Sequence, residues 1–146
     1  MKSDKARPKK VSTALKLLYL AFVLVIISSV LNISLFIPSL LQMGLDSAYS
    51  GFIIGVTIFI YVLSLGFLAF LIYKIRKGRN WARITFLVLS AIGIPFSIIS
   101  VILSLTINPL SEVLILSIVE IILETTAIVL LFQKKSSEWF NSKKTR

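Results

Sequence analysis

Residues 111–133, SEVLILSIVEIILETTAIVLLFQ, decide the fold of this chain. As an α-helix, at about 1.5 Å per residue, the stretch reaches about 34 Å, enough to cross the roughly 30 Å hydrocarbon core of a bilayer. Glu120 and Glu124 lie near its middle. A carboxylate that faces hydrocarbon is costly, so we expect this helix to turn both side chains toward other helices.

Glu120 and Glu124 are one helical turn apart and share a face, which Ser117 extends. Two carboxyl groups this close in a medium of low dielectric constant are not expected to be ionised together, so the pair should share a proton. Asn32 and Tyr61, from other apolar runs, are candidate hydrogen-bond partners. These five residues form a candidate intramembrane site, which either binds a proton or cation or holds helices together through polar contacts.

Three further apolar runs predict three more spans, at about 17–37, 51–73 and 84–107, before the fourth at 111–133. Apolar residues make up 57% of the 146-residue chain and charged residues 15%, against roughly 45–50% and about 25% in soluble domains. The expected fold is therefore an all-α integral membrane four-helix bundle, made of two antiparallel hairpins. Pro38 and Pro109 are expected to end the first and third spans.

Basic tails are predicted at 1–16 and 134–146, on either side of a membrane domain at 17–133. Of the 16 Lys and Arg residues, six lie in the first tail, five in residues 74–83 and five in the last tail. With four spans, all three basic segments fall on one side, which the positive-inside rule places in the cytoplasm with both termini. We expect this face to contact anionic lipid headgroups. Nucleic acid is not an expected partner, because the basic residues flank apolar runs.

Small residues recur at spacings of three and four along the third predicted span, a pattern typical of closely packed membrane helices. The predicted helix-packing seam comprises Ser90, Gly93, Ser97, Ser100 and Ser104, together with the Gly51-x-x-x-Gly55 pair of the second span. The serines could instead line a water path that faces the two acids. Pro95 lies off the seam and is expected to kink the helix.

Two short motifs lie outside the apolar runs: GRNWAR at 78–83 and SSEWF at 136–140. Together they resemble a group of uncharacterised small bacterial four-span membrane proteins, in which a G-[RK]-N-W-A-R turn opens the third span and an S-x-x-W-F end follows the fourth. The resemblance implies a bacterial inner-membrane protein of the same layout, and it implies no activity.

The side chains of these motifs also suit positioning at the membrane surface. Arginine can reach lipid phosphates, indole rings favour the headgroup region, and asparagine can cap a helix start. The predicted interfacial anchors are Arg79, Asn80, Trp81, Arg83 and Trp139.

The chain contains no His and no Cys. It therefore lacks the commonest general base, a thiol nucleophile and the commonest ligands of transition metals, so neither an enzyme nor a cofactor or metal site is expected. The favoured prediction is a non-catalytic accessory or interaction component of the membrane, whose partner could be a second copy or another membrane protein. The alternative is a proton-linked transporter of a small or cationic solute that uses Glu120 and Glu124.

Overall fold

The computed structural model describes residues 6–107 and 112–144. These residues form helices and no strand: α1 (Lys9–Gln42), α2 (Ser47–Arg76), α3 (Asn80–Ile107), α4 (Glu112–Phe132) and α5 (Lys134–Lys144). Helices α1 to α4 are each long and apolar enough to cross a membrane. The prediction of an all-α fold with four candidate spans is therefore confirmed.

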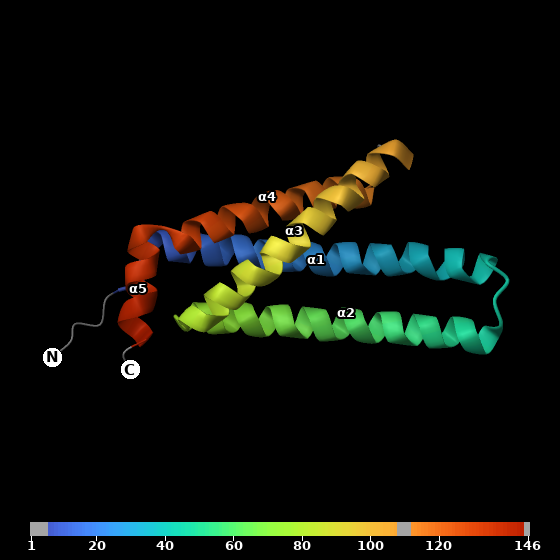
Figure 1. Cartoon of the computed structure of the whole chain (residues 1–146), viewed down its shortest axis with the longest axis horizontal. Coiled ribbons are helices and arrows are strands. Elements are labelled where there is room, and N and C mark those ends of the chain that lie inside the picture. The colour runs from blue at the N-terminus through green and yellow to red at the C-terminus, as the bar shows by residue number, and fades with distance from the viewer. Residues whose placement is uncertain (1–5, 108–111, 145–146) are drawn as a thin grey trace.

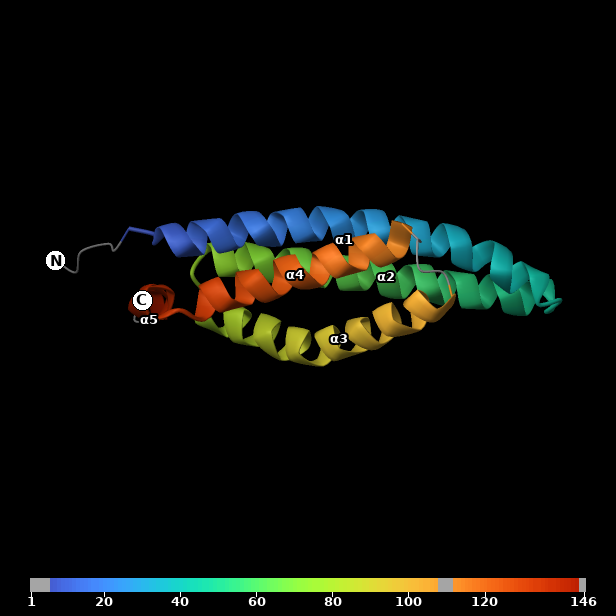
Figure 2. The same ribbon diagram turned by 90° about the horizontal axis from the view of Figure 1, so that it is seen from above.

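Helix α1 packs most extensively along α4, while α2 packs against α1 and α3 packs against α4. Figure 1 shows α2 beside α1, with α3 running at an angle to both. The beginning of α1 and the short helix α5 lie at the same end of the molecule (Figure 1), which we call the α5 end. From that end α3 diverges from α2 and bows outward (Figure 2), and Pro95 lies inside this helix.

Pro38 does not end the first helix, contrary to the prediction, because α1 continues to Gln42. A proline removes one backbone hydrogen bond, here the one that the carbonyl of Ser34 would accept, and membrane helices tolerate that loss. The helix ends before Gly44, whose φ of +69° is the left-handed conformation that glycine adopts after a helix. The side chain of Asp46 then caps the start of α2. The predicted stop at Pro109 lies outside the described residues, as does the 108–111 turn.

Much of each predicted basic tail is helical: residues 9–16 belong to α1, and residues 134–144 form α5. Helix α1 begins at Lys9, and Val11, Ala14 and Leu15 in its first turns are buried. At the other terminus, α5 extends the chain beyond α4. The few apolar residues of each tail fall on one face, and burial of that face favours a helix over a disordered segment.

The most buried side chains gather at the α5 end. This core draws on all five helices: Val11, Ala14, Leu15, Leu18, Leu71, Ile72, Ile75, Ala82, Phe86, Ala127, Leu131, Trp139 and Phe140. Most large apolar side chains elsewhere in the described chain are exposed, as expected for helices whose solvent is lipid. The bundle is therefore closed at the α5 end and more loosely packed away from it.

Arg83 connects the start of α3 to α4 and α5 within this core. Its Nη1 donates hydrogen bonds to the carbonyl of Leu131 and to Ser137 Oγ, both at 3.2 Å. Its guanidinium lies 4.5 Å from the ring centroid of Phe132 and 4.7 Å from that of Phe140, within the range of cation–π attraction. The GRNWAR turn and the SSEWF segment thus meet in one buried junction, although they are far apart in the sequence.

This junction corrects the roles predicted for three interfacial residues. Arg83 and Trp139 are only 6% and 5% exposed, so both contact protein instead of lipid headgroups. Asn80 begins α3, but its Oδ1 accepts no hydrogen bond from the described residues, so the predicted cap is not formed. Arg79 and Trp81 are exposed, and their contact with headgroups stays a prediction.

Replacement of Phe140 should test the core at the α5 end. We expect Phe140→Ala to lower the free energy of unfolding by about 3–5 kcal/mol, because the fully buried ring would leave a cavity beside Arg83. Denaturant unfolding of the purified protein in detergent micelles, followed by circular dichroism, measures the change. The matched variant Phe59→Ala removes a ring that is 66% exposed and should cost less than about 1 kcal/mol. Equal losses of unfolding free energy in the two variants would contradict the burial of Phe140 in a packed core.

Candidate functional site

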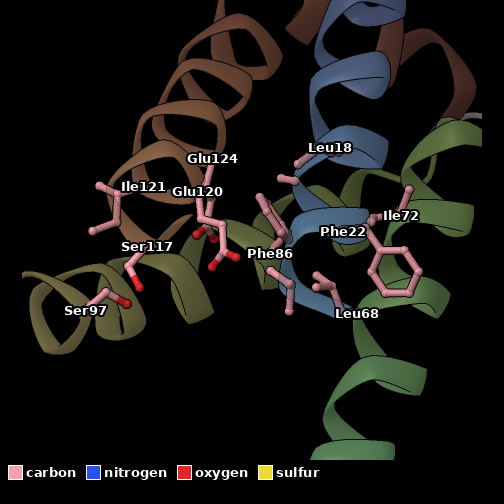
Figure 3. Close-up of a pocket in the computed structure, with 12 residues that line it drawn as sticks. Leu18, Phe22, Leu68, Ile72, Phe86, Ser97, Ser117, Glu120, Ile121 and Glu124 are labelled. Carbon is pink, nitrogen blue, oxygen red and sulfur yellow. The ribbon is translucent and has the colours of Figure 1, made fainter. Parts of the chain in front are cut away.

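Glu120 and Glu124 project from α4 into the interior of the bundle. Figure 3 shows both carboxyl groups on the side of α4 that faces Leu18 and Phe86. The pattern of α4 enforces this orientation, since Ile118 and Ile122, half a turn away from Glu120, are exposed on its outer side. The expectation that the acids turn away from lipid therefore agrees with the packing of α4.

The two acids have different surroundings. Oε1 of Glu124 accepts a hydrogen bond from Ser90 Oγ, which comes from α3. Oε1 of Glu120 is enclosed but accepts no hydrogen bond from the described residues. The hydroxyl of Ser28, on α1, is close enough to interact with the Glu120 carboxyl. Glu124 is thus tied to a neighbouring helix, while one enclosed oxygen of Glu120 has no hydrogen-bond partner among the described residues.

A cavity of about 460 Å³, the polar cavity, lies between α1, α2, α3 and α4 and includes Glu120 in its wall. Its polar lining consists of Ser28, Ser29, Asn32, Tyr61, Ser97, Ser100, Ser104, Ser117 and Glu120. Four of the five predicted site residues therefore line one space, although they come from three different helices. The fifth, Glu124, does not line it.

Glu124 lines a second, smaller cavity of about 100 Å³, which we call the inner cavity. Glu120 and Ser117 line both cavities, so the two meet at these residues. The rest of the inner cavity is largely apolar, and its wall includes Leu18 and Phe86 of the core. Glu120 therefore lies at the boundary between a polar space and an apolar one that the core closes (Figure 3).

Three hydroxyl groups around the polar cavity present acceptor atoms to it. Ser29, Ser97 and Ser117 each donate their hydroxyl proton to a backbone carbonyl of their own helix, at 2.6, 3.1 and 2.9 Å. A hydroxyl has one proton, so these oxygens have only lone pairs left to offer. With Glu120 beside them, the polar cavity favours a ligand that carries hydrogen-bond donors and a positive charge.

Only one serine of the predicted seam on α3 is buried against another helix. Ser90 is buried against α4, but Ser97, Ser100 and Ser104 line the polar cavity. Small side chains can either let two helices touch or leave a space between them. The outward bow of α3 produces the second arrangement (Figure 2).

The glycines of the predicted seam also lie apart from other helices. A Cβ added to Gly51, Gly55 or Gly93 would meet no described atom within 4 Å. These positions therefore do not hold the helices of one chain together.

Two serines of this site were not predicted from sequence. Ser28 and Ser29 are buried on α1 and line the polar cavity. Their spacing from Asn32, four and three residues, places all three on neighbouring positions of one helix, and that signal was available in the sequence. Among the described residues, no three His, Cys, Asp or Glu side chains are grouped so that they could hold a metal ion.

No protein-family model matches the chain, and no curated protein or solved structure is significantly similar to it. The likeness of the two motifs to small bacterial four-span proteins therefore stays a prediction. Function has to be inferred from the site itself.

Because the chain has no cysteine, single introduced cysteines can report whether the polar cavity contains water. Ser100→Cys should react with a water-soluble maleimide in native membranes at least about tenfold faster than Ile99→Cys, because alkylation requires a hydrated thiolate. Ile99 is the matched control, since it is exposed on the same helix but lines neither cavity. Equally slow labelling at both positions would show that the cavity is dry.

Proposed function

We propose that the chain is a non-enzymatic transporter of a bacterial cytoplasmic membrane, in which Glu120 exchanges a proton for a small cationic solute. The observation that carries this proposal is the polar cavity, which has walls from four helices and includes the Glu120 carboxyl. A carboxyl in this position can hold either a proton or a cation, and the two compete for the same oxygens. Exchange of one for the other is the elementary step of proton-coupled transport.

The groups that face Glu120 support its role as the proton site. Glu124 is the neighbouring carboxyl on the same helix, and Tyr61 is the titratable side chain that α2 contributes to the polar cavity. The cavity-lining side chains of α1 and α3 are apolar, hydroxyl or amide groups, and none is basic. Given the groups that line the two cavities, the negative charge of Glu120 can therefore be neutralised only by a proton or by a bound cation.

The proposed topology has four spans, with both termini in the cytoplasm. It is supported by the segregation of Lys and Arg into three segments and by the position of α5 beside the beginning of α1 (Figure 1). In this topology α1–α2 and α3–α4 are antiparallel hairpins, the core lies in the cytoplasmic half, and the polar cavity lies in the outer half. Lys74, Lys77 and Arg79 would then meet anionic lipid headgroups.

A second candidate function is assembly with another membrane protein, or with a second copy, without transport. The observation in its favour is α2, whose most apolar stretch has no buried residue and whose Gly51 and Gly55 face open space. A helix of a partner could approach closely there. Sequence alone favours assembly, but assembly leaves the polar cavity around Glu120 without a role.

Proton exchange can be tested in liposomes that contain a trapped pH dye. When guanidinium, a permanent cation, is added outside, the interior should become more alkaline as protons leave in exchange. Glu120→Gln should slow this change at least about tenfold, because the amide carries no exchangeable acidic proton. Glu112→Gln is the matched control, since this exposed carboxyl at the start of α4 lines neither cavity and should retain the wild-type rate.

Two results would count against transport. Equal rates of the interior pH change for wild type and Glu120→Gln would show that Glu120 does not take part in transport. Absence of flux in the wild type across guanidinium, methylammonium and sodium, combined with crosslinked dimers in native membranes, would favour the second candidate function.

Sidedness of labelling tests the proposed topology. In intact cells, Leu45→Cys between α1 and α2 should react with a membrane-impermeant maleimide, because this connection lies outside in the proposed arrangement. Lys135→Cys on α5 should react only after permeabilisation, because its segment is basic and belongs in the cytoplasm. The reverse pattern would overturn the orientation.

A further inference from the structure

A third cavity, the side cavity, adjoins the polar cavity between α1 and α2. It measures about 300 Å³, and most of its wall is apolar, with Val25, Ile60 and Leu65 among the lining residues. Ser29 and Tyr61 line both the side cavity and the polar cavity, so the two spaces meet at these residues. An apolar compartment thus opens from the same space that contains Glu120.

The polar cavity is suited to a primary ammonium group. Ser29, Ser97 and Ser117 have lone pairs to offer, and the carboxyl group of Glu120 lies in the same wall. A primary ammonium brings three N–H donors, as a lysine side chain does, whereas a quaternary ammonium brings none. No basic residue lines any of the three cavities, so nothing there competes for the carboxyl.

The side cavity is suited to an aliphatic chain. At about 300 Å³, the side cavity is many times larger than the roughly 10–15 Å³ that a single water molecule needs in the same measure, so it has room for an aliphatic chain of several carbons. Ile60 in its wall is also 55% exposed, which means that the compartment borders the surrounding lipid. A chain that is dissolved in the bilayer can therefore enter it from the side.

We propose that the solute is an amphipathic primary amine, whose ammonium group binds at Glu120 and whose aliphatic chain lies in the side cavity between α1 and α2. This inference rests on the proposed transport function and names the substrate class of the same site. The ammonium group supplies charge and hydrogen bonds to Glu120 in place of the displaced proton. The size of the side cavity selects solutes by the length of their aliphatic chain.

Protection of an introduced cysteine measures binding to this site. The reporter is Ser100→Cys in nanodiscs, alkylated by iodoacetamide in the presence of increasing amine. Three probes are cations at neutral pH: octylamine, methylammonium and octyltrimethylammonium. The fourth probe, octanol, is neutral. All variants are compared at one lipid concentration, so that partition of the probes into the bilayer is the same throughout.

Octylamine should protect the reporter at lower concentration than any other probe. Octyltrimethylammonium should need at least about tenfold more, because it offers no N–H donor to the carboxyl and the serines. Glu120→Gln should raise the half-protecting concentration of octylamine by at least about tenfold, since one hydrogen-bonded charge is lost.

A matched pair of tryptophan variants separates the tail from the head group. Leu65→Trp fills the side cavity and should raise the half-protecting concentration of octylamine by about tenfold, while changing that of methylammonium less than about twofold. Leu63→Trp, two residues away, adds the same ring to a position that is 61% exposed and lines no side-cavity wall, so it should leave both values unchanged. Unchanged methylammonium protection in Leu65→Trp also shows that this variant is folded.

The outcomes distinguish this inference from the proposed function. If methylammonium protects through Glu120 but octylamine protects no better, and Leu65→Trp has no effect, the amphipathic substrate is overturned while cation binding stands. If octyltrimethylammonium or octanol protects as well as octylamine, the primary ammonium is overturned. If no amine protects the wild-type reporter, the inference fails, and the liposome measurement with guanidinium decides on transport by itself.

Discussion

A carboxyl group cannot face hydrocarbon without a large cost in free energy, and the arrangement of the helices follows from that constraint. It turns α4 so that Glu120 and Glu124 point inward, and it therefore sets which face of α4 meets α1. Ser90 on α3 satisfies Glu124 with a hydrogen bond and fixes α3 against α4 at that level. Beyond Ser90, α3 bows away, and the space left between the helices is the polar cavity that includes Glu120.

Tight packing and open space are separated along the bundle. The core and the Arg83 junction hold all five helices together at the α5 end. Burial of a guanidinium is costly, and here two hydrogen bonds and two aromatic rings offset part of that cost, although Nε has no partner among the described residues. This packed end can stabilise the fold while the remainder of the bundle keeps a cavity.

The four spans and the inward face of the acids could be predicted because they depend on local sequence. Apolar runs of sufficient length give the spans, and a spacing of four residues gives the shared face of Glu120 and Glu124. The ends of the helices were harder to predict. Pro38 reads as a stop but lies within α1, and the basic tails give no local sign that their few apolar residues pack into the core.

The sequence left a serine-lined space beside the acids as one of two alternatives and gave no sign of the Arg83 junction, because both depend on how distant segments meet. Arg83 and Trp139 have the character of interfacial residues, and only the docking of α5 against α3 buries them. Likewise, a series of small serines is compatible with a close helix contact or with an open wall. The crossing and curvature of α3 decide between the two, and no local pattern encodes them.

If Glu120 exchanges a proton for a cation, its carboxyl must be in contact with water and with the cation, and infrared spectroscopy of the protein in lipid bilayers tests this most directly. The carbonyl stretch of a protonated carboxyl can be assigned to Glu120 by its loss in Glu120→Gln. If Glu120 is in contact with the polar cavity, this band should shift within seconds of transfer into D₂O and should disappear when a cation binds. A band that persists unshifted for hours, and that cations do not change, would show instead a dry carboxyl pair that only holds helices together.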